Sequence, residues 1–107
     1  MFTPKIRFIA MSDVHTKENS DCVELERLKR GIAFAKKYAD KCEYKAIDAI
    51  YFIGDFANGG REQEMLNFKS ALEECAGDIP YVISLASHEY MSEGEDAAKE
   101  KLKRIFG

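Results

Sequence analysis

The residues of this chain that could bind a metal ion lie in three short segments, each of which follows an apolar run. Asp13 and His15 follow the first run, Asp55 follows the second, and His88 follows the third. Both histidines of the chain belong to this set. Carboxylate and imidazole groups are ligands for divalent transition metals such as zinc, manganese and iron. The residue types therefore favour metal-assisted chemistry.

The spacing within the segments is compatible with a shared site. Asp13 and His15 are two positions apart in a chain leaving a strand, so both side chains can point the same way. Asp55 follows Gly54, and glycine suits tight turns and close approach of the backbone to a ligand. The two oxygens of Asp55 could lie between two metal ions. Such a pair, about 3.5–4 Å apart, activates water and stabilises both oxygens of a phosphoryl displacement.

The elements that must position these residues are predicted from hydrophobic periodicity. Strand-length apolar runs, rich in β-branched and aromatic residues, occupy residues 6–11, 49–53 and 81–86. The second and third are almost continuously apolar, which predicts strands buried on both faces, as in a parallel sheet. Apolar residues at helical spacing occupy residues 25–39, 65–75 and 98–105. A capping box from Ser92 to Glu95 predicts the start of the last helix.

The resulting order, β-α-β-α-β-α, favours an α/β domain with a parallel sheet, right-handed crossovers and flanking helices. Ligand sites in such sheets form beyond the carboxyl ends of the strands, where the three segments converge. Crossovers that all run in one direction place the helices on one face. The other face then requires a reversal of strand order, another chain, or further sequence to cover it.

The three segments, taken in order, resemble the calcineurin-like metallophosphoesterases. That family's pattern is D-x-H, then G-D-x-x-x-x-G, then G-N-H-D/E, followed by later histidines. Residues 13–15 match the first block, residues 54–60 match the second, and residues 86–89 stand where the third belongs. The resemblance implies a four-layer sandwich, of which residues 1–107 form the amino-terminal half as a single truncated domain. It also implies an enzyme that hydrolyses phosphate mono- or diesters with two divalent ions of manganese, iron or zinc.

The resemblance also implies roles for individual residues. Asp13 and His15 would bind one metal, and Asp55 would bridge the pair. His88 would be the acid that donates a proton to the phosphate or leaving group. Asn58 is a further candidate, assisting from the second segment, whereas Glu89 is expected to be a loop carboxylate rather than a ligand. Outside this context, the same residues are ordinary turn and loop residues.

Two departures from the family pattern bear on activity. Ser87 occupies the position of the expected asparagine ligand, and Ala86 replaces the preceding glycine. Ser87 is a metal-ligand candidate by position, but its hydroxyl is shorter than an amide, and a turn or cap role is the simpler interpretation. The second departure is that the later histidines of the family do not occur in residues 1–107. The chain by itself is therefore not expected to build the full dinuclear site.

Composition excludes several classes of function. The 16 Lys and Arg residues against 19 Asp and Glu give a net charge of −3, which lacks the electrostatic footprint of a nucleic-acid-binding protein. No apolar run approaches the roughly 20 residues that a membrane span requires. The charged start shows no secretory signal. Three widely spaced cysteines without a C-x-x-C motif predict reduced thiols in the cytoplasm.

Two functions stay open at this stage. The first is a phosphoesterase, or the amino-terminal part of one, that acts on a phosphorylated small molecule or another phosphoester. The second is a catalytically impaired binding or interaction module that keeps the scaffold. An unrelated nucleotide-binding module is a weaker alternative because no G-x-G-x-x-G or Walker-type loop is present. The uncovered sheet face predicts a homo-oligomer or a missing second half.

Overall fold

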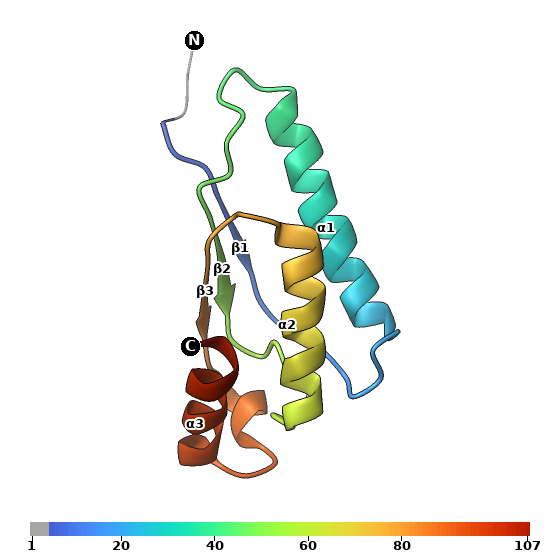
Figure 1. Cartoon of the computed structure of the whole chain (residues 1–107), viewed down its shortest axis with the longest axis vertical. Helices are drawn as coiled ribbons and strands as arrows, with labels where there is room; N and C mark the ends of the chain where they lie inside the picture. Colours follow the sequence, from blue (N-terminus) through green and yellow to red (C-terminus); the bar gives the residue numbers. More distant parts are fainter. Residues whose placement is uncertain (1–4) are drawn as a thin grey trace.

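The computed structural model describes residues 5–107 and shows strands and helices that alternate along the chain (Figure 1). The elements are β1 (Phe8–Met11), α1 (Val23–Asp40), β2 (Ala49–Ile53), α2 (Glu62–Ala76), β3 (Tyr81–Ser84), the 3-10 turn η1 (Ser87–Tyr90) and α3 (Glu95–Phe106). This order confirms the predicted alternation, with η1 as an added short turn. Residues 1–4 belong to the charged start in which the sequence shows no secretory signal, and they lie outside the described residues.

The sheet has the strand order β1-β2-β3, and both neighbouring pairs are parallel. Ile9 pairs with Ile50, and Ile50 pairs with Tyr81. Since the spatial order follows the chain order without reversal, right-handed crossovers place α1 and α2 on the same face (Figure 1). The carboxyl ends of all three strands therefore meet at one edge.

The hydrophobic core lies between the sheet and its covering helices. Phe52 of β2 and Phe68 of α2 are almost fully buried, and their rings meet edge to face with centroids 5.0 Å apart. Leu28 and Ile32 of α1 lie one helical turn apart and contribute the same kind of buried surface. Burial of one such side chain stabilises the fold by about 1.5–3 kcal/mol. The core thus fixes α1 and α2 against the sheet and holds the strand ends in place.

The opposite face of the sheet is exposed in the described residues. Alternate strand residues Phe8, Tyr51, Ile53 and Val82 are 55%, 42%, 61% and 55% exposed, and we call these four residues the open face. The prediction of strands buried on both faces is therefore wrong for this chain. The physical reason is that α1 and α2 lie on the same side, so each strand alternates between buried and exposed positions.

The last helix starts differently from the prediction. Gly94, with φ at 90°, is the N-cap of α3, and no side chain caps this terminus, so the capping box from Ser92 is wrong. α3 is held in place by Lys101, which is buried. Its ammonium group donates to the carbonyl of Gly60 at 3.0 Å and pairs with Glu93 at 2.9 Å. This contact ties α3 to the loop that follows β2.

Candidate metal centre

The loops that follow β1 and β2 run side by side beyond the sheet. The Asp13 N–H donates to the carbonyl of Gly54 at 3.2 Å, and the His15 N–H donates to that of Asp55 at 3.0 Å. Thr16 and Ala57 then form an isolated parallel bridge. Because this pairing continues the β1–β2 ladder past the strands, the first two segments predicted from the sequence lie next to each other.

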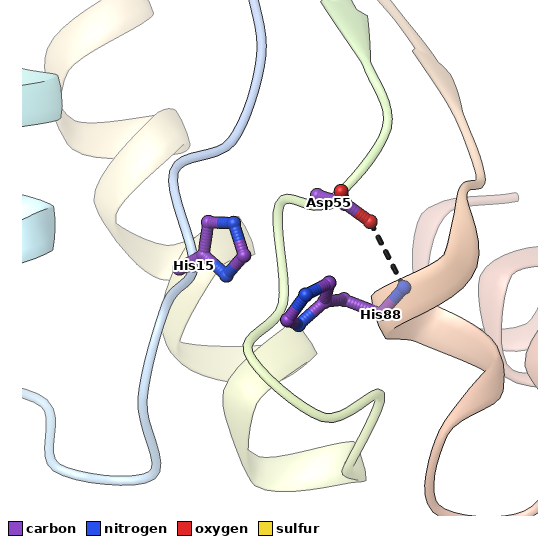
Figure 2. Close-up of side chains that lie close together, drawn as sticks. All are labelled: His15, Asp55 and His88. Carbon is purple, nitrogen blue, oxygen red and sulfur yellow. Dashed lines mark hydrogen bonds between the residues drawn. The ribbon is translucent and has the colours of Figure 1, made fainter.

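Three of the predicted residues converge on one point. His15, Asp55 and His88 each offer one ligand atom, and these atoms all lie within 4.8 Å of one another. Figure 2 shows the His88 ring extending from η1 toward the ring of His15; the ring centroids are 4.3 Å apart in an edge-to-face arrangement. Donor atoms around one ion lie about 3–4 Å apart, given bond lengths of about 2.0–2.2 Å. The cluster therefore needs only small side-chain shifts to hold a divalent cation.

Asp13 joins this cluster through His15. Its Oδ1 lies 3.3 Å from Nε2 of His15. The pKa of the Asp13 carboxyl is held below its usual range, first by a hydrogen bond from the Ser12 side chain and then by one from His15, with a smaller contribution from the Asp55 carboxyl group. Asp13 is thus an anion at neutral pH. The carboxylates of Asp13 and Asp55 therefore lie at the same edge of the sheet.

The backbone at these positions is strained. Asp13, His15 and Asp55 have φ values of 57°, 54° and 52°, and they are the non-glycine residues with positive φ in the described chain. A left-handed conformation costs a non-glycine residue roughly 1–2 kcal/mol. Such residues cluster where function requires an unusual placement of a side chain. The strain falls on three residues that the sequence predicts to be metal ligands, although their ligation itself stays a prediction.

The tautomer of His88 follows from its neighbours. Its Nδ1 lies 2.6 Å from the carbonyl oxygen of Asn58. Because a carbonyl only accepts hydrogen bonds, Nδ1 carries a proton and donates it, which leaves Nε2 as the free nitrogen. The His88 N–H also donates to Oδ1 of Asp55 at 2.9 Å (Figure 2). Asn58 therefore contacts the site through its main chain, while its side chain is exposed.

The remaining predicted ligand lies at the start of η1. Ser87 is exposed there, and its place among the ligands stays a prediction. The preceding residue, Ala86, explains why residue 54 is a glycine. A Cβ on Gly54 would lie 2.3 Å from the Cβ of Ala86. The loops after β2 and β3 thus approach too closely for any larger residue at position 54.

The donors at this edge suit one divalent ion better than two. Two carboxylates and one imidazole, from Asp13, Asp55 and His15, would hold a single ion, with the imidazole of His88 beside it. A second ion would share Asp55 and would have the short hydroxyl of Ser87 in place of an amide oxygen. The chemistry of the residues present therefore fits a divalent cation, with a weaker second position.

A cavity adjoins the cluster on the side of α1. Its volume is about 360 Å³, and it is bordered by Asp13 and His15 on one wall and by Glu24, Arg27 and Leu28 on the other. Glu24 pairs with Lys17 at 3.6 Å. Arg27 forms no hydrogen bond or ion pair with the rest of the described chain, so its guanidinium is available to an anionic ligand.

Glu89, next to His88, is predicted from the sequence to be a loop carboxylate rather than a ligand, and the structure shows that it is buried. Glu89 is 1% exposed, and its carboxylate accepts hydrogen bonds from the backbone amides of Asp55, Ala57 and Ala86. The sequence signal at this position is the acidic residue that ends the third family block, which gives no indication of burial. Its contacts appear only when the loops after β2 and β3 are brought together.

Comparison with known families identifies the family of the chain. A scan against protein-family models matches the calcineurin-like phosphoesterase family over residues 6–106. The chain belongs to the calcineurin-like phosphoesterase family, as its three segments predicted. Searches of curated proteins and of solved structures gave no match. None of the helices in residues 5–107 combines the length and apolar character needed to cross a bilayer.

Proposed function

We propose that this chain is a metal-dependent phosphoesterase, or the part of one that carries its first metal-binding segments, and that it hydrolyses phosphate mono- or diesters. The observation that carries the proposal is the convergence of His15, Asp55 and His88 within 4.8 Å at the strand ends. Membership of the calcineurin-like phosphoesterase family supports hydrolase chemistry. Manganese, iron and zinc are the ions that this donor set suits.

The residues of the site would have two roles, metal binding and proton transfer. Asp13, His15 and Asp55 would hold the ion, which when bound activates water and neutralises charge on the phosphoryl group. Asp55 is oriented by the His88 N–H, which donates to its Oδ1. His88 has its Nδ1 anchored on Asn58, which leaves Nε2 facing the site; when the ring is protonated at both nitrogens, Nε2 would donate a hydrogen bond to the phosphate or a proton to the leaving oxygen.

The cavity beside α1 supports a small phosphorylated substrate. Its volume of about 360 Å³ falls in the range of small-molecule sites. Leu28 and Met11 give it an apolar wall, and Arg27 gives it a guanidinium suited to paired hydrogen bonds with phosphate or carboxylate oxygens. The substrate in this proposal is a phosphomonoester or diester with a compact leaving group.

A second candidate function is a binding module that retains one weak metal. The observation that favours it is Ser87, whose hydroxyl replaces an amide ligand and weakens the second metal position. In either case the three cysteines are unpaired in the structure, which supports our proposal of a reducing, cytoplasmic location.

Hydrolysis of p-nitrophenyl phosphate and its bis-ester, with manganese or zinc added, tests the proposal. The wild-type protein should show metal-dependent turnover that Asp55→Asn abolishes. Asp78→Asn makes the same chemical change at an exposed turn before β3 and should leave turnover unchanged. Metal binding by calorimetry without turnover would favour the binding module. Absence of both metal binding and turnover would contradict the metal site itself.

A further inference from the structure

The side chain of Glu89 joins two loops that carry the candidate ligands. Its Oε1 accepts hydrogen bonds from the N–H of Asp55 at 2.8 Å and of Ala86 at 2.9 Å. Its Oε2 accepts from the N–H of Ala57 at 3.0 Å. Glu89 lies in η1, while Asp55 and Ala57 lie in the loop after β2. One buried carboxylate therefore links the chain that positions Asp55 to the turn that carries His88.

This carboxylate is buried at an energetic cost. Burial raises the pKa of the Glu89 carboxyl. The hydrogen bonds from the three backbone amides lower this pKa, and the nearby Asp55 carboxylate raises it. No lysine or arginine in the described chain forms an ion pair with it. Burying a charge without a counterion is unfavourable unless hydrogen bonds satisfy it, and here backbone amides alone do so. These hydrogen bonds orient the backbone N–H groups of Asp55, Ala57 and Ala86, which belong to the loops of the site.

We propose that Glu89 is a positioning residue that sets the spacing between Asp55 and His88 in the candidate metal centre. The proposal rests on the proposed function. Glu89 holds the backbone of Asp55 in its left-handed conformation, and the adjacent His88 N–H holds the carboxylate of Asp55. Two consecutive residues of η1, His88 and Glu89, therefore form hydrogen bonds with the side chain and the backbone of Asp55. Loss of the first contact frees the peptide to rotate and moves the carboxylate away from the imidazoles.

An independent observation supports this role. A Cβ on Gly60 would lie 2.0 Å from the backbone oxygen of Glu89, so the loop after β2 packs directly on η1. Only a residue without a side chain fits at this contact. The two loops are therefore in close backbone contact on one side of Glu89 and hydrogen-bonded to its carboxylate on the other, which leaves little freedom in their spacing.

The chain contains a matched control in Glu64. It is also buried, at 4% exposed, and its Oε1 accepts hydrogen bonds from the N–H of Gly59 and of Arg61, both at 2.9 Å. It therefore has the same chemistry and contacts the same loop. Unlike Glu89, it bonds to no backbone group of the four candidate ligands. Glu64→Gln tests general destabilisation of the loop, and Glu89→Gln tests positioning.

The experiment compares these two variants in cobalt binding and in histidine spectra. Glutamine keeps the volume of glutamate but presents an NH₂ group to one backbone donor. Glu89→Gln should weaken Co²⁺ binding by about 10- to 100-fold, the usual effect of losing an outer partner of a metal ligand, and should change the visible Co²⁺ spectrum. Glu64→Gln should leave both unchanged. The proposal is overturned if Glu89→Gln binds Co²⁺ with unaltered affinity and spectrum, or if Glu64→Gln has the same effect.

A second readout separates this inference from the metal proposal. If the wild-type protein binds no Co²⁺, the proposed function fails, and the ring nitrogen shifts of His88 in the metal-free protein decide the role of Glu89. Those shifts should move in Glu89→Gln and stay fixed in Asp78→Asn, and unchanged shifts in Glu89→Gln reject positioning. If Glu89→Gln does not fold, Glu89→Asp replaces it in both measurements, since it keeps the charge but shortens the reach.

Discussion

Replacement of Gly60 by alanine should force the loop after β2 away from η1. Gly60 has φ at 78°, and an added Cβ would lie 2.0 Å from the oxygen, 2.6 Å from the carbonyl carbon and 2.9 Å from the Cα of Glu89. All three atoms belong to the backbone, so no side-chain rotation can relieve the contact. The loop or η1 must move as a unit.

The expected cost combines two effects. The left-handed conformation costs an alanine roughly 1–2 kcal/mol. Forcing backbone segments apart in a packed site costs about 1–3 kcal/mol more. Gly60→Ala should therefore destabilise the protein by about 2–5 kcal/mol, a large part of the roughly 5–15 kcal/mol that stabilises an ordinary domain.

Gly94→Ala is the matched control. Gly94 also has positive φ, at 90°, but nothing lies within 4 Å of an added Cβ there. Because Gly94, with φ at 90° and ψ at 179°, lies in a region that is essentially restricted to glycine, this variant should show the conformational cost alone, roughly 1–3 kcal/mol. Urea denaturation followed by circular dichroism measures both free energies of unfolding. Equal losses in the two variants would refute the close contact between the loop after β2 and η1.

Three further outcomes are expected. Thr16→Val should stabilise the fold by about 1 kcal/mol in thermal unfolding, because within residues 5–107 the buried hydroxyl of Thr16 has no hydrogen-bond partner. A loss of stability would show that this hydroxyl does make a hydrogen bond. We propose that the open face mediates self-association. Light scattering should then show oligomers of the wild type and monomers of the double variant Ile53→Lys, Val82→Lys. A monomeric wild type at high concentration would reject this proposal. The pKa of Asp48 is lowered from its ordinary 3.8 by the Arg7 N–H and then by a hydrogen bond from the Tyr44 side chain, so its contribution to stability is present above pH 3.8 and is lost as the pH falls through the lower folded value. The difference in stability between wild type and Asp48→Asn should shrink over that acidic range, and a difference that grows there would contradict the assignment.

The sequence by itself determined the order of elements and the three segments that hold the candidate ligands. Apolar runs and helical periodicity are local properties, so β2 was predicted with its observed bounds, Ala49–Ile53. Parallel topology then required Asp13, His15, Asp55 and His88 to lie at one edge, since parallel strands end at the same edge. The family pattern added expected roles to these positions, and the family match confirmed the membership.

Only the tertiary structure decided how these residues act on one another. The free nitrogen of His88 depends on the carbonyl of Asn58, which lies 30 positions away in the chain. The buried state of Glu89 depends on amides supplied mainly by another loop, and the exposure of the open face depends on α1 and α2 lying on the same side. The placement of α3 likewise depends on a distant contact, the hydrogen bond from Lys101 to the carbonyl of Gly60. These features arise from contacts between segments distant in sequence, whose geometry no local pattern encodes.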